Sequence, residues 1–74
     1  MKDEKIELKQ TGVKVSLDLD GEEGNAFFIL AKVRHALMMA GYSSEFREAF
    51  TNEATSNDYN HLLETVSKVV EVEL

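Results

Sequence analysis

The segment NEATSNDYNHLLETV, residues 52–66, gathers the side chains of this sequence that are best suited to chemistry. Glu53, Asp58, His61 and Glu64 include carboxylates beside an imidazole, a combination that can transfer protons or bind a divalent metal. Asp58 and His61 alone are too few ligands for a metal, and the chain has no cysteine to add a thiolate. We therefore expect no metal or cofactor, and we interpret His61 as a solvated side chain on the polar face of a capped amphipathic helix.

Glu53 is the exception within this segment, because a helical wheel places it on the apolar side of its own helix, among Phe46, Ala49 and Phe50. An inward-pointing carboxylate costs free energy unless it accepts hydrogen bonds. The nearest free donors are the first-turn N–H groups of the next helix. We predict that Glu53 pins the corner between two helices, where Thr55 and Asp58 have the spacing of a capping box. A catalytic acid or base is the alternative interpretation.

A second acidic segment, DLDGEEGN at residues 18–25, is similar to half of a calcium-binding loop. It lacks the third oxygen ligand and the closing glutamate that such a loop requires. Gly21 and Gly24 do not form a phosphate loop either, because no Lys-Ser or Lys-Thr pair follows them. We interpret the segment as a turn whose acids face the N-terminus of the following helix.

The elements that must position these residues begin with two stretches of alternating polarity. Ile6 and Leu8 form the first, residues 10–12 interrupt it, and Val13 to Leu19 form the second. Alternation with a period of two indicates strands with one apolar face, so we predict an N-terminal β-hairpin.

Three helices are predicted after the hairpin. The first runs from Asn25 to Ala40 and is closed by Gly41. The second begins after Ser43 or Ser44 and ends near Ala54, and the third runs from about Asn57 to Val69 with Thr55, Ser56 or Asn57 as its N-cap. The ending VVEVEL suits either a third strand beside the hairpin or further helix. The predicted fold is therefore α+β, with the hairpin packed against three helices.

Length and charge limit the classes of function that we expect for this chain. We expect the 74 residues to form one domain, 1–74, with a small hydrophobic core and no disulfide bond. Small domains of this kind often gain stability by self-association, so a homodimer is one expectation. The net charge is −6, and residues 15–74 carry four basic against eleven acidic side chains, which argues against nucleic-acid binding. No apolar run is long enough to span a membrane and no signal peptide is visible, so we expect a cytoplasmic protein.

The first helix carries more apolar side chains than one packed face requires. Its second face holds further apolar residues, interspersed with basic residues and a histidine: Phe27, Phe28, Ala31, Met38 and Met39, with Lys32, Arg34 and His35 among them. Either the other two helices wrap this helix completely, or the second face is an exposed interface for self-association or for a protein partner.

The chain resembles a group of short uncharacterised proteins from bacteriophages and prophage-bearing bacteria. The resemblance covers residues 24–73 and rests on GNAFFILAKVRHALMMAG, on EATSNDYNHLLETV and on the ending VEVEL. Its most specific part is the pattern EATSxDYxHLL, from Glu53 to Leu63. The group has no assigned activity, so the resemblance implies a setting, the cytoplasm of an infected host cell, and no site residue.

These observations favour a non-enzymatic phage accessory protein that binds a host or phage protein. One alternative is a nucleic-acid mimic, whose carboxylates imitate phosphates and block a DNA-binding protein. The other is a small enzyme that uses Glu53 and His61 with Asp58, which requires these side chains to converge in a pocket.

Overall fold

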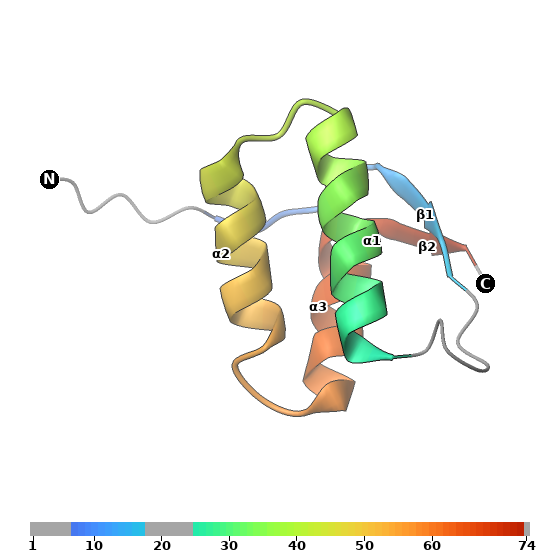
Figure 1. The fold of residues 1–74 in the computed structure, drawn as a ribbon, viewed down its shortest axis with the longest axis vertical. Coiled ribbons are helices and arrows are strands. Elements are labelled where there is room, and N and C mark those ends of the chain that lie inside the picture. The colour runs from blue at the N-terminus through green and yellow to red at the C-terminus, as the bar shows by residue number, and fades with distance from the viewer. Residues whose placement is uncertain (1–6, 18–24, 74) are drawn as a thin grey trace, which may run out of the picture.

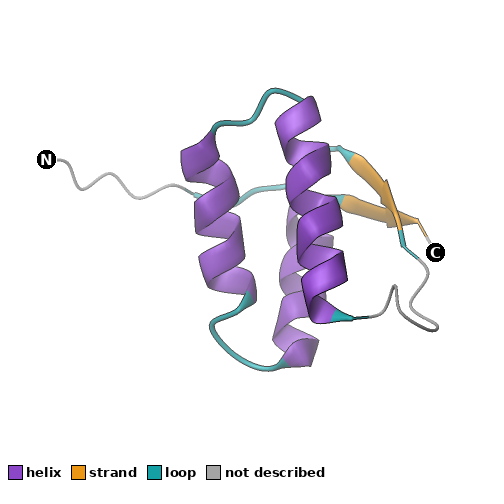
Figure 2. Ribbon diagram, in the orientation of Figure 1, coloured by secondary structure: helices purple, strands orange, loops and turns teal. Residues whose placement is uncertain are grey.

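Three helices and two short strands make up the part of the chain that this computed structural model describes, residues 7–17 and 25–73. In chain order they are β1 (Lys14–Ser16), α1 (Ala26–Met39), α2 (Ser44–Ala54), α3 (Tyr59–Val69) and β2 (Glu71–Glu73). The helices stand side by side, and the strands lie beside α1 and α3 on the side away from α2 (Figures 1 and 2). The predicted α+β class is confirmed.

At the start of each helix a side-chain oxygen accepts a first-turn N–H group. Ser43, one of the two predicted caps, caps α2, and Asn25, which was predicted as the first residue of α1, is its cap. Gly41, with φ of +93°, follows the end of α1 in the left-handed conformation that glycine adopts without strain.

The predicted N-cap of α3 was wrong. Asp58 itself is the cap, and its Oδ1 accepts the N–H of His61 at 2.9 Å. Thr55 instead ends α2 as its C-cap, and its hydroxyl donates to the Thr51 carbonyl oxygen at 2.8 Å. Ser56 and Asn57 belong to the turn between the helices, so α3 begins two residues later than the predicted start near Asn57.

The sheet joins segments from opposite ends of the chain. β1 and β2 are parallel, with Lys14 opposite Glu71, Val15 opposite Val72 and Ser16 opposite Glu73. The C-terminal strand that the alternation allowed is therefore present, but its partner is β1 and no hairpin accompanies it. Residues 7–13 contain no strand. Ile6, Leu19 and residues 18–24 of the segment that is similar to half of a calcium-binding loop lie outside the described residues.

Gln10 and Thr11 explain why the chain does not turn back at residues 10–12. The Thr11 N–H and hydroxyl both donate to the Val69 carbonyl oxygen, at 2.8 and 2.7 Å, and Gln10 Nε2 donates to that of Ser67 at 3.1 Å. Carbonyl groups in the last turn of a helix have no partner within the helix. The segment predicted as a hairpin turn thus caps the C-terminus of α3 and then enters β1.

The hydrophobic core lies between the helices and the inner face of the sheet. Its largest fully buried side chains come from every helix and from the residue after α3: Phe50, Ile29, Leu37, Val33, Val66, Val69 and Val70. Thr65 is also buried, and its hydroxyl donates to the His61 carbonyl oxygen at 2.8 Å. This core holds the outer face of α1 and the corner between α2 and α3 in fixed positions.

Candidate functional site

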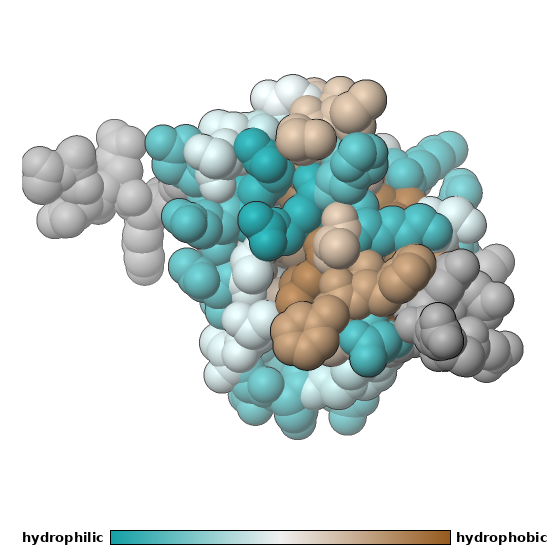
Figure 3. Space-filling view, in the orientation of Figure 1, coloured by the Kyte–Doolittle hydropathy of each residue, from teal (hydrophilic) through white to brown (hydrophobic). Residues whose placement is uncertain are grey.

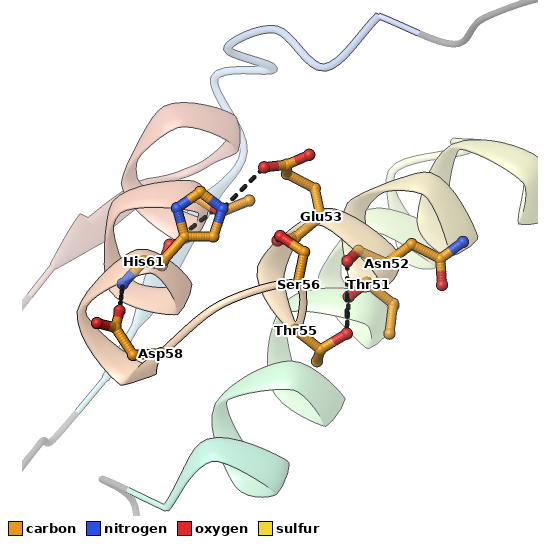
Figure 4. Close-up of polar contacts among 8 residues, drawn as sticks. Thr51, Asn52, Glu53, Thr55, Ser56, Asp58 and His61 are labelled. Atoms are coloured by element: carbon orange, nitrogen blue, oxygen red, sulfur yellow. Dashed lines mark hydrogen bonds and ion pairs between the residues drawn. The ribbon is translucent and has the colours of Figure 1, made fainter.

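Glu53 and His61 meet across the corner between α2 and α3 (Figure 4). Glu53 Oε2 lies 2.7 Å from His61 Nε2, and the two side chains are 51% and 28% exposed. The prediction of a tie between the helices is therefore right about Glu53 but wrong about its burial and its partner, because an imidazole takes the place of backbone amides. His61 is likewise not a purely solvated side chain.

The position of Glu53 follows from the twist of the buried stripe along α2. Phe46, Phe50 and Ala54 are the buried residues of this helix, spaced four apart. Each step of four residues turns the stripe by about 40°, since a helix advances about 100° per residue. By the last turn Ala54 faces the core, and Glu53 lies at its edge, exposed and opposite α3.

Asp58, Ser56 and Thr55, which also belong to this corner, form hydrogen bonds with the backbone. Asp58 caps α3 at the N–H of His61, while the Ser56 hydroxyl donates to the Glu53 carbonyl oxygen at 2.8 Å. An imidazole held by a carboxylate can serve as a base, but here the neighbouring hydroxyls of Thr55 and Ser56 donate to main-chain carbonyls and not to the imidazole. Within residues 7–17 and 25–73, no three potential ligands gather around a metal-sized space. We therefore interpret the corner as a structural latch.

Removing the latch should have a small effect on stability. Glu53→Ala and His61→Ala are each expected to lower the free energy of unfolding by less than about 1 kcal/mol, and a double-mutant cycle should give a coupling of about 0.2 to 1 kcal/mol, because the pair is partly exposed. Urea unfolding measures both quantities. Glu64→Ala, at an exposed position of α3, is the matched control.

A loss above about 2 kcal/mol for Glu53→Ala would contradict this interpretation. It would mean that the carboxylate satisfies buried donors, as the sequence had suggested, and that the surface pair is incidental.

The outer face of α1 is the second candidate site. Phe27 is 82% and Met39 72% exposed, while Phe28 and Met38 are each nearly half exposed. His35 is exposed between them. Figure 3 shows apolar side chains gathered over α1 in two groups, one over its N-terminal half and a smaller one at its C-terminal end. The complete wrapping of α1 by α2 and α3 is therefore wrong, and the predicted exposed face is present.

Among residues 7–17 and 25–73, the other helices and the strands cover one side of α1. Its buried residues are Ile29, Leu30, Val33 and Leu37, which face α2, α3 and β1. The opposite side has a shallow hollow lined by Phe28, Ala31, Lys32 and His35. Ala31 and Lys32 lie on the second face that the sequence indicated, but the hollow that they form with Phe28 and His35 was not predicted.

Comparisons with known proteins give no family to which this surface could be assigned. No protein-family model, no curated protein and no solved structure matches the chain. None of the helices described within 7–17 and 25–73 has the length and apolar character to cross a membrane. The two candidate sites are therefore the basis for the proposed function.

Proposed function

We propose that this protein is a non-enzymatic binding module that acts by docking the outer face of α1 onto another protein. The observation that carries the proposal is the exposure of four large apolar side chains on one helix face: Phe27, Phe28, Met38 and Met39. The resemblance of residues 24–73 to short bacteriophage proteins supports a role as a phage accessory protein in the host cytoplasm.

The chemistry of this face suits a protein interface. Aromatic and methionine side chains are enriched at the centres of protein interfaces, and methionine adapts its shape to irregular partners. Exposed apolar area is removed from water when such a face docks, which contributes roughly 25 cal/mol for each Å² of apolar surface buried. Phe27 and Met39 are at opposite ends of α1, so the whole length of the helix is available for contact.

Nucleic-acid mimicry is less well supported by the same helix. A mimic must present carboxylates on its contact surface, yet the sequence of α1, AFFILAKVRHALMM, contains none. The acidic side chains of the described residues lie on other parts of the chain.

The double variant Phe27→Glu/Met39→Glu should fold but lose its partner. Both side chains are mostly exposed, so the free energy of unfolding should change by only about 0.5 kcal/mol per substitution, whereas two charges in an apolar interface should prevent docking. The tagged wild-type protein and the variant would be used to capture proteins from phage-infected host lysate, with mass spectrometry as the readout.

The matched control is Asn60→Glu/Ser67→Glu, which adds the same charge at exposed positions of α3. It should retain the partner that Phe27→Glu/Met39→Glu loses. A partner retained by both double variants would refute docking through α1, and so would unfolding of the α1 variant, since that requires Phe27 or Met39 to be buried in the core.

A further inference from the structure

The hollow on the outer face of α1 has the geometry of a packing site for another helix. Its four lining residues, Phe28, Ala31, Lys32 and His35, occupy positions i, i+3, i+4 and i+7 of one helix. Such residues form a diamond on a helix surface, and in helix-to-helix packing a diamond of this kind receives one side chain of the facing helix. The small Ala31 side chain leaves room for a large apolar side chain to enter.

The hollow belongs to a seam that runs along α1. Phe28, Ala31, His35 and Met38 are spaced by three, four and three residues, which is the spacing of the contact positions in a coiled coil. All four are exposed in the structure. Phe27, Lys32, Arg34 and Met39 flank the seam at the positions that set partner choice in paired helices.

Charge distinguishes between the possible occupants of this seam. The two charged residues of α1, Lys32 and Arg34, are both basic, and both flank the seam. Lys32 already takes part in an interaction within the chain, so we expect Arg34 to contribute more to the attraction of a partner carboxylate. Pairing two copies through this face would bring their α1 cations together without a carboxylate from either helix.

Building on the proposed function, we infer that the partner presents an acidic amphipathic helix to α1. An apolar side chain of that helix fills the hollow at Ala31, and its flanking glutamate or aspartate side chains lie beside Lys32 and Arg34. The partner helix follows the seam from Phe28 to Met38, a length of about three helical turns.

Two synthetic helical peptides test this inference with the full-length protein. The first has leucine at the a and d positions of three heptads and glutamate at e and g, and the second has lysine at e and g. Binding is measured by fluorescence anisotropy, and the contact surface is mapped by amide chemical shifts. We expect the acidic peptide to bind about tenfold more tightly at low salt, with the difference lost near 1 M salt, and to shift resonances of α1.

Two single variants locate the contacts. Ala31→Gln fills the hollow with a neutral side chain at an exposed helical position, so it should weaken binding of the acidic peptide by about tenfold or more. Arg34→Glu should reduce or reverse the preference for the acidic peptide, because it replaces a flanking cation with an anion. Both variants should remain helical, and circular dichroism is the measurement that checks this.

Three results would overturn the inference while leaving docking through α1 intact. They are equal binding of the two peptides, no binding of the acidic peptide at millimolar concentration, and a sedimenting dimer that Ala31→Gln dissociates, which would make a second copy the occupant. Failure of the proposed function is a separate result, because it is read from retention of the cellular partner by Phe27→Glu/Met39→Glu.

Discussion

Phe50→Ala is expected to remove about 3 to 5 kcal/mol from the free energy of unfolding, the range for truncating a buried aromatic side chain. Phe50 is fully buried in α2, and the close packing of the core leaves a cavity when the ring is removed. A domain of 74 residues has a total stability of about 4 to 11 kcal/mol. The variant should therefore be marginally folded, with a thermal midpoint lowered by about 12 °C or more.

Phe27→Ala makes the same chemical change at a position that is 82% exposed, and it is the control for this experiment. It should change stability by no more than about 0.5 kcal/mol. Urea unfolding followed by circular dichroism gives both values. Equal losses for the two variants would show that Phe27 is also part of the core, contrary to the exposed face on which the proposed function depends.

The helices were predictable because their signals are local. Asn25 and Ser43 precede apolar stretches of helical period, and Gly41 ends α1, so each boundary could be placed from a few neighbouring residues. Asp58 is the instructive error. It was assigned to the first turn of α3 because Thr55 has the capping-box spacing, but the chain needs Ser56 and Asn57 to make the turn.

The pairing of the strands was less predictable, because alternation identifies a strand without naming its partner. Residues 7–9 and the segment around Val15 alternate in the same way, and residues 10–12 between them have the composition of a turn. The pairing is instead decided by contacts far apart in sequence, among them the bonds from Gln10 and Thr11 to the end of α3. Such contacts leave no periodic signal in the sequence.

The candidate site was predicted in part for a similar reason. The sequence of α1 shows more apolar residues than one packed face needs. The interpretation of its second face as an exposed interface requires Phe27 and Met39 to be exposed, and they are. The contact between Glu53 and His61 was not predicted, because it depends on how α3 is placed against the last turn of α2.

Glu71→Pro is expected to destabilise the domain by disrupting the parallel strand pair. The Glu71 N–H donates to the Val13 carbonyl oxygen at 2.8 Å, and proline has no N–H to donate. Leaving a partly buried carbonyl unpaired costs about 1 to 3 kcal/mol, and the fixed φ of proline adds strain in a strand. The lower free energy of unfolding should be measurable by urea unfolding. Hydrogen exchange should also be faster at the Leu17 N–H, which donates to the Glu73 carbonyl oxygen in the same ladder.

Glu71→Ala is the matched control, because it keeps the backbone N–H and removes only an exposed side chain opposite Lys14. Its cost should stay below about 1 kcal/mol, the range for one cross-strand pair. If residues 71–73 did not pair with β1, the two variants would behave alike, since Glu71 would then have no ladder bond to lose. A difference of about 1 kcal/mol or more between Glu71→Pro and Glu71→Ala is therefore expected from the bond between the Glu71 N–H and the Val13 carbonyl oxygen.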